Sequence, residues 1–129
     1  MAENLADPQS GGDVSSISAG FEAFLKIAEL WRLSSDEQIK LLGSPARSTY
    51  FKWKKDGGVI PADTLERISH ILSIFKALEI LIPDADAADS WVRRENDYFD
   101  GQSALNVMLG GQVVDIYRVR QYLDAQRGC

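Results

Sequence analysis

The sequence predicts an all-α protein, with an N-terminal helix-turn-helix bundle followed by a small helical domain. Apolar residues recur at steps of three and four along most of the chain, as they do on one side of a helix. The β-branched residues fall into the same helical spacing and not into alternation, so we predict no strand. Glycines, prolines and capping residues divide the pattern into helices of ordinary length.

The N-terminal region divides into a polar tail and a first helix. Residues 1–16 are rich in Ser, Gly and Asp with little apolar content, and we expect them to be disordered. The first helix follows, with one apolar stripe formed by Ile17, Phe21, Phe24, Leu25, Ala28 and Trp31.

Two short helices separated by a glycine come next. Ser34 and Glu37 have capping-box spacing and open a helix that carries Ile39, Leu41 and Leu42. Gly43 ends this helix. Ser44 and Pro45 fit the cap and first position of the next helix, which runs to about Lys55 before Gly57 and Gly58.

A long helix then closes the first half. Pro61 begins it and Pro83 ends it, and its apolar stripe is Leu65, Ile68, Leu72, Phe75, Leu78 and Ile82. We therefore place a helix-turn-helix domain at residues 17–83 and a second helical domain at 84–129.

The second domain is predicted to contain three helical segments. The first covers roughly residues 84–96 and is centred on Trp91, and a turn at Asp100 and Gly101 follows it. A short helix then carries Leu105, Val107, Met108 and Leu109. Gly110 and Gly111 break it, and the last helix carries Val113, Ile116, Val119 and Leu123.

Composition places the chain among ordinary globular proteins. Of its 129 residues 45% are hydrophobic and 26% charged, and no apolar run approaches the roughly 20 residues of a membrane span. The N-terminus has no signal-peptide pattern. Cys129 is the sole cysteine, so a disulfide within the chain is excluded, and we expect a cytoplasmic protein.

The residues show no catalytic constellation. The single histidine, His70, lies off the apolar stripe of its helix, and we expect it to be a solvated surface residue. No glycine-rich phosphate loop follows a strand, and the acids of residues 84–100 match no calcium loop. We therefore expect no enzymatic activity, no cofactor and no metal.

One basic patch lies in this acidic chain of net charge −5. In the helix of residues 45–55, Ala46, Tyr50 and Trp53 share the buried side by their spacing. The exposed remainder supplies Arg47 and Ser48 as candidate base contacts, and Lys52, Lys54 and Lys55 as candidate phosphate contacts. The alternative is that these cations only solvate the helix.

The last helix carries residue types that are enriched in protein interfaces. These are Tyr117, Arg118, Arg120, Tyr122 and Arg127. The alternative is that Tyr122 packs in the core and that the arginines offset nearby acids. The residues by themselves favour this alternative.

Two stretches together resemble the Xre/MbcA/ParS-type antitoxin family. The sequence LGSPARSTYFKWKK at residues 42–55, followed by LERI at 65–68, is similar to the family's Xre-like helix-turn-helix. The second half resembles the family's toxin-binding domain through Ala87, Trp91, Asn96, Phe99, Gly101, Leu105, Leu109, Gly110, Val119, Tyr122 and Leu123. The chain departs from the family at Ser103-Ala104, where Ser-Pro is usual.

The resemblance implies an antitoxin of a type II toxin–antitoxin system. Its partner would be a RES-domain toxin, which consumes NAD or transfers ADP-ribose from it, and its C-terminal domain would cover the toxin's NAD pocket. The resemblance also implies repression of its own operon, and we expect a dimer or higher oligomer on the operator. The candidate toxin contacts are Tyr117, Arg118, Arg120, Gln121, Arg127, Gly128 and Cys129, with Trp91 holding the helices together from inside.

Two other functions stay open at this point. The chain could be a helix-turn-helix repressor whose C-terminal helices only dimerise it. It could also be a scaffold protein that does not bind DNA.

Overall fold

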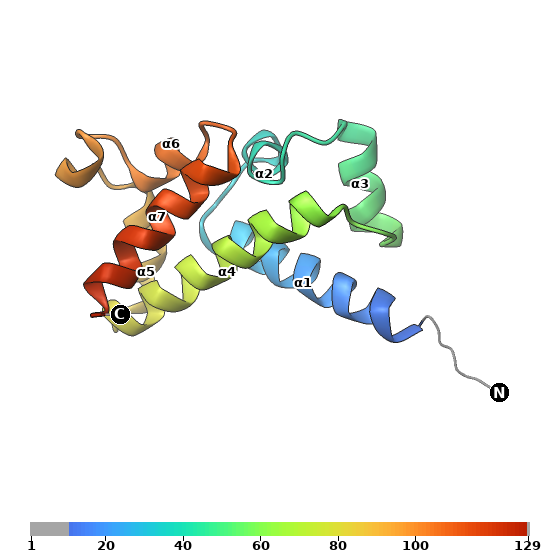
Figure 1. The fold of residues 1–129 in the computed structure, drawn as a ribbon, viewed down its shortest axis with the longest axis horizontal. Helices are drawn as coiled ribbons and strands as arrows, with labels where there is room; N and C mark the ends of the chain where they lie inside the picture. The colour runs from blue at the N-terminus through green and yellow to red at the C-terminus, as the bar shows by residue number, and fades with distance from the viewer. Residues whose placement is uncertain (1–10, 129) are drawn as a thin grey trace.

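The computed structural model describes residues 11–128, and side chains from residue 19 onward. This part of the chain forms seven α-helices and two short 3₁₀ helices, which confirms the all-α fold class. Two helices of 20 residues, α1 (Gly11–Leu30) and α4 (Ala62–Leu81), cross along the middle of the molecule (Figure 1). The last helix, α7 (Val113–Gln126), packs on α4, so α4 lies between α1 and α7.

The two halves share one hydrophobic core. One buried cluster contains Phe24 of α1 and Trp31 directly after this helix, Ile71 and Ile74 of α4, and Ile116 of α7. Polar contacts also join the halves. Arg93 donates from Nε to the carbonyl of Trp31 at 3.1 Å and from Nη2 to the carbonyl of Arg32 at 2.7 Å.

The first helix begins earlier than the sequence analysis predicts. Residues 11–16, expected in a disordered tail, lie in α1, while residues 1–10 lie outside the described residues. Once the packed part of a helix has formed, each further residue adds one hydrogen bond without a new nucleation cost. A helix can therefore extend into a segment of low apolar content, which hydrophobic spacing cannot detect.

The short helix α2 (Ser35–Leu41) begins as predicted. The Ser34 hydroxyl accepts from the Glu37 N–H at 3.1 Å, and the Glu37 carboxylate accepts from the Ser34 N–H at 2.9 Å. Gly43 follows with φ of +99° and Ser44 with φ of +60°.

The next helix, α3 (Arg47–Asp56), begins two residues later than predicted. Ser44 cannot be its cap, because a capping residue is extended whereas Ser44 has left-handed backbone. Ala46 takes the capping position instead and makes no side-chain cap. Ala46 is also exposed, so the expected buried side of α3 holds only for Tyr50 and Trp53.

The apolar stripe predicted for α4 is wrong in part. Ile68 and Leu78 are buried as expected, but Ile71 and Ile74 are fully buried although they lie off the predicted stripe. Four predicted members, Leu65, Leu72, Phe75 and Ile82, are only partly buried. Because α1 and α7 cover α4 from two sides, its buried surface is wider than one stripe.

The C-terminal half is more broken than predicted. The expected helix over 84–96 is divided into α5 (Ala85–Ser90) and a 3₁₀ helix, η1 (Trp91–Arg93). A second 3₁₀ helix, η2 (Asp97–Phe99), leads to the left-handed turn at Asp100 and Gly101. The helix α6 (Ala104–Met108) carries Leu105, Val107 and Met108 as predicted, while Leu109 follows as its C-terminal cap. The Ser103 hydroxyl caps the start of α6 by accepting from the Asn106 N–H at 3.0 Å.

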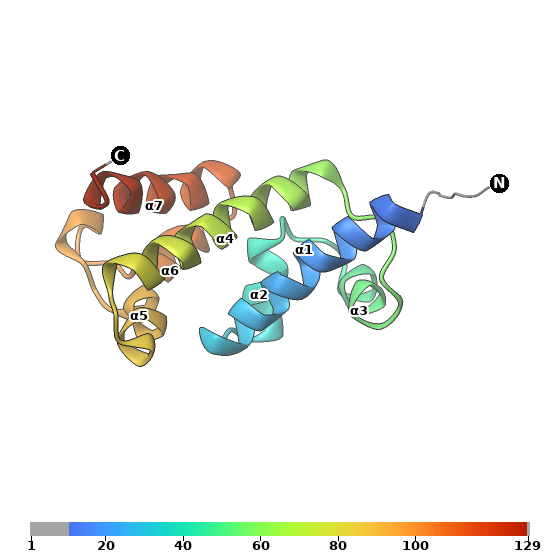
Figure 2. The same ribbon diagram turned by 90° about the horizontal axis from the view of Figure 1, so that it is seen from below.

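The two ends of the molecule are formed by different helices. The ribbon is elongated, with α3 at one end and the carboxyl end of α7 at the other (Figures 1 and 2).

None of the helices in the described part of the chain is long and apolar enough to cross a membrane.

Candidate functional site

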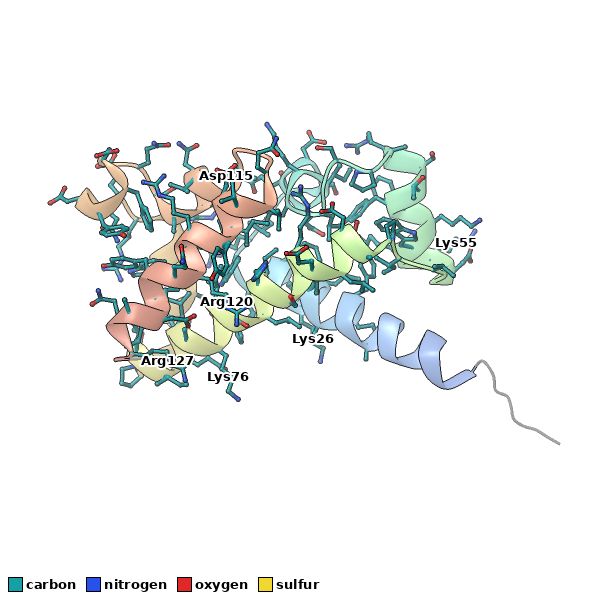
Figure 3. All side chains as sticks on the ribbon, viewed as in Figure 1. Lys26, Lys55, Lys76, Asp115, Arg120 and Arg127 are labelled. Carbon is teal, nitrogen blue, oxygen red and sulfur yellow. The ribbon has the colours of Figure 1, made fainter. Side chains whose placement is uncertain are left out.

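The outer side of α3 is a basic surface. Arg47, Ser48, Lys52, Lys54 and Lys55 are all exposed, while Tyr50 and Trp53 are buried beneath them. Figure 3 shows Lys55 projecting from the end of α3, away from the rest of the molecule. The exposure of these five residues agrees with the sequence analysis, and their contact with DNA stays a prediction.

Phe51 lies among the cations of this surface. Its ring is 42% exposed, with the Arg47 guanidinium 5.4 Å and the Lys54 ammonium 5.7 Å from the ring centroid. A cation over an aromatic face is held electrostatically. Arg47 also donates a hydrogen bond to the carboxylate of Asp36 on α2, so its guanidinium already has an acidic partner.

Tyr50 anchors α3 to α2. Its side chain is fully buried and its hydroxyl donates to Oε1 of Gln38. Burial raises the pKa of the Tyr50 phenol, and nearby Arg47 lowers the pKa by a smaller amount. The phenol therefore stays protonated and can donate this bond. Trp53 fixes α3 to α1: its ring packs edge-on against the ring of Phe21, with 6.0 Å between the ring centroids.

The outer side of α7 carries the second set of candidate residues. Tyr117 is 42% exposed, and Arg118, Gln121, Arg127 and Gly128 are exposed too. Arg127 lies at the end of α7, on the same edge of the molecule as Lys76 of α4 (Figure 3). Cys129 lies outside the described residues.

Tyr122 belongs to an aromatic cluster and not to the outer surface. Its ring stacks on that of Trp91, with 6.2 Å between the ring centroids. The rings of Tyr98 and Phe99 also pack against it, at centroid distances of 4.4 Å and 5.4 Å. This supports the alternative in which Tyr122 packs inside. Trp91 is only partly buried, whereas its neighbour Val92 is fully buried. The cluster joins η1, η2 and α7 into one unit.

His70 is not the solvated residue that the sequence analysis expects. Its side chain is only 12% exposed, because α7 packs over this side of α4. Its Nδ1 lies 2.9 Å from Arg120 Nη1, and its ring lies 5.3 Å from the ring of Tyr117. Its Nε2 lies 3.5 Å from Glu66 Oε2, one turn back on α4. The four-residue spacing of Glu66 and His70 was the one signal in the sequence for part of this cluster.

Arg120 differs from the other candidate arginines. It contacts His70 on one side, and its Nε lies 3.7 Å from Oδ2 of Asp124, one turn further along α7. Its side chain is one third exposed. Arg120 is therefore partly a structural residue of the α4–α7 contact.

Two shallow clefts follow the seam between α4 and α7. One, of about 240 Å³, is lined by Glu66, His70, Val113, Val114 and Tyr117. The other, of about 310 Å³, is lined by Leu72, Ser73, Lys76, Arg120, Asp124 and Arg127. Val114 and Lys76 were not predicted as part of this site, since the exposure of a residue next to the α4–α7 contact depends on which side of α4 is covered by α7. Within the described residues, no group of three His, Cys, Asp or Glu side chains could hold a metal ion.

Two family models match the chain, one for each half. Residues 15–73 match the antitoxin Xre-like helix-turn-helix domain, and residues 77–128 match the antitoxin Xre/MbcA/ParS C-terminal toxin-binding domain. The chain belongs to the Xre/MbcA/ParS antitoxins. This confirms the family that the sequence resembles. The antitoxin is also 63% identical over 128 residues to "Uncharacterized protein y4oB" of Sinorhizobium fredii, with 99% of each chain covered.

The family matches assign a role to each half of the antitoxin. The basic helix α3 lies in the helix-turn-helix match and α7 lies in the toxin-binding match, while α4 contributes to both. Proteins of this family are regulators that act by binding, which confirms that the antitoxin is not an enzyme. Its partner is a toxin.

Proposed function

We propose that the antitoxin neutralises a RES-domain toxin by covering the toxin's NAD site, and that it represses its own operon through α3. The observation that carries the proposal is the toxin-binding match, which ends on α7 with Tyr117, Arg118 and Gln121 exposed along it. Tyrosine and arginine are the residue types that most often anchor protein interfaces.

The carboxyl end of the chain is the part that we assign to the NAD site. A pocket for NAD holds a diphosphate, so it presents cations and hydrogen-bond donors. The last carbonyls of a helix have no partner within it, so the end of α7 offers hydrogen-bond acceptors to such groups. Gly128 has left-handed backbone with φ of +80°, and after it the chain can turn away from α7. Arg127 and Gly128 are exposed, so a partner can reach them.

The proposal for DNA rests on the exposed cations of α3. Lysines at the end of a reading helix neutralise phosphates, while residues at its start reach base edges. One such helix covers only a few base pairs, so the antitoxin would bind its operator as a dimer or higher oligomer.

Growth rescue during co-expression with the neighbouring toxin gene tests the toxin proposal. Deletion of Arg127 to Cys129 is expected to weaken toxin binding by on the order of 2 kcal/mol, about 30-fold, because the exposed residues after α7 lose their contacts with the pocket. Tyr117→Ala combined with Gln121→Ala should weaken binding as well. The dissociation constants are measured by calorimetry. Lys26→Ala is the control, since Lys26 is exposed on α1, and α4 lies between α1 and α7.

Circular dichroism separates loss of binding from loss of fold in these variants. Full rescue by a folded chain without its last three residues would remove the terminus from the mechanism. If the Tyr117 and Gln121 variant also binds the toxin with unchanged affinity, the outer side of α7 is not the interface. The C-terminal helices would then serve association between antitoxin chains.

A further inference from the structure

His70 stands between the two halves of the antitoxin. It belongs to the helix-turn-helix match, yet its ring lies under α7, the helix that carries the exposed candidate toxin contacts. Tyr117 and Arg120 are one turn apart on α7, and both touch this ring. His70 and Tyr117 line one of the two clefts along the α4–α7 seam, and Arg120 lines the other.

The contact with Arg120 determines which form of the imidazole fits. A guanidinium can only donate hydrogen bonds, so the Nδ1 atom 2.9 Å from Arg120 Nη1 must accept. The neutral ring then carries its proton on Nε2, which faces the Glu66 carboxylate at 3.5 Å. A neutral His70 therefore offers Nδ1 as an acceptor to Arg120 and the N–H of Nε2 as a donor to Glu66.

A protonated ring does not fit the same place. Both nitrogens would donate, so Nδ1 would meet Arg120 donor to donor, with two cations at 2.9 Å. The charged and titratable groups around the ring are Glu66 on α4 and Tyr117, Arg120 and Asp124 on α7. Glu66 attracts the protonated ring towards α4, while Asp124 holds Arg120 on α7. Protonation therefore pulls the two partners apart.

We propose that His70 is a positioning residue for toxin binding, which fixes Arg120 and Tyr117 on α7 while its ring is neutral. The inference rests on the proposed toxin contacts of α7. Arginine has many rotamers, and an arginine already held in place loses less freedom when a partner binds. By this reasoning the antitoxin presents Arg120 and Tyr117 on its toxin-binding side already in place.

Two substitutions of His70 separate the effect of its hydrogen-bond acceptor, Nδ1, from the effect of its aromatic ring. His70→Asn keeps an acceptor near the position of Nδ1 but cannot titrate. His70→Phe keeps a ring beside Tyr117 but offers no acceptor. At neutral pH we expect His70→Phe to weaken toxin binding about 2- to 10-fold and His70→Asn to stay near the wild-type affinity.

The nitrogen shifts of the ring give a readout that does not depend on the toxin. His70 is the sole histidine of the chain, so its ¹⁵N signals need no assignment. The proposal expects a neutral ring with its proton on Nε2. A proton on Nδ1 at neutral pH, or equal affinities of His70→Phe and wild type, would overturn it. If none of the proteins binds the toxin, the proposed function fails, while the nitrogen shifts still decide the arrangement of His70.

Discussion

Gly43 is the residue on which the turn between α2 and α3 depends. Its φ of +99° lies in the left-handed region, where a residue with a side chain is strained. A Cβ at this position would lie 3.1 Å from both Arg67 Nε and Asp63 Oδ2. Those two atoms are hydrogen-bonded at 3.0 Å, and Arg67 is only 7% exposed, so its guanidinium cannot move away without cost, whereas the Asp63 side chain is exposed. The turn is thus fitted against the first turns of α4.

We therefore expect Gly43→Ala to lower the free energy of unfolding by about 1–2 kcal/mol. Urea denaturation followed by circular dichroism measures the change. Gly20→Ala is the matched control, because a Cβ there meets nothing within 4 Å and the residue lies inside α1. The free energy of unfolding of Gly20→Ala should rise by about 0.5–1 kcal/mol, because alanine has a higher helix propensity than glycine. Equal stability of Gly43→Ala and wild type would contradict the argument.

Single residues were predictable from the sequence where their role is local. The capping box of Ser34 and Glu37 lies within four residues and is confirmed atom by atom. His70 was assigned to the surface, and this prediction is wrong. The burial of His70 depends on α7, which is distant in sequence, and spacing within a helix does not indicate which second helix packs on it. Trp91 was assigned to the interior and is partly buried, stacked on Tyr122 of α7.

At the scale of the element, α3 shows how a helix can be predicted while its first turn is not. Tyr50 and Trp53 occupy its buried side, and the five candidate DNA contacts are exposed as their spacing predicts. The start of the helix was placed two residues too early, because Ser44 and Pro45 form a strong sequence signal for a cap. The left-handed backbone of Ser44, which follows from the Gly43 turn, overrides that signal.

Lys54 of α3 provides a test of the proposed DNA surface. A phosphate contact carries no sequence information, so Lys54→Ala should weaken binding to the operator and to unrelated duplexes alike. The slope of log K against log salt should become shallower by about 1. Fluorescence anisotropy at several salt concentrations measures this slope. Lys26→Ala on α1 is the control and should keep the wild-type slope. An unchanged slope, also for Lys54→Glu combined with Lys55→Glu, would show that α3 is not the DNA-binding surface.

At the scale of the whole molecule, the basic surface of α3 and the carboxyl end of the candidate toxin surface lie at opposite ends. The basic side of α3 is at one end of the elongated fold, and the carboxyl end of α7 is at the other (Figures 1 and 2). Screening by salt removes most of the interaction between exposed charges beyond roughly 10 Å. The charge of one surface should therefore have little effect on binding at the other.

The two binding activities should accordingly be separable by mutation. The double variant Lys54→Glu, Lys55→Glu is expected to lose DNA retention in a gel-shift assay and to keep full growth rescue against the toxin. Deletion of Arg127 to Cys129 should have the opposite effects. The wild type and Lys26→Ala serve as references in both assays. Loss of both activities in either variant, with the fold intact, would contradict independent surfaces.

The fold class and the order of the helices were predictable from the sequence, because helical spacing and stop signals are local. How the halves pack was not. The sequence analysis treats residues 17–83 and 84–129 as two domains, and the domain boundary near residue 83 stays a prediction. In the structure the halves bury one common cluster, in which Ile74 of α4 and Ile116 of α7 are both fully enclosed. A pairing of this kind depends on contacts between distant segments, which one sequence does not reveal.

The continuity of α4 has a consequence for the antitoxin's evolution. Its first twelve residues fall in one family match and its last five in the other, with no loop between them. Each residue added to an α-helix rotates everything beyond it by about 100° and advances it by about 1.5 Å. Insertions and deletions in α4 would therefore turn the carboxyl half around the helix axis and separate the surfaces that α1 and α7 bury. The residue count of α4 therefore fixes the angle at which the two ends of the molecule face their partners.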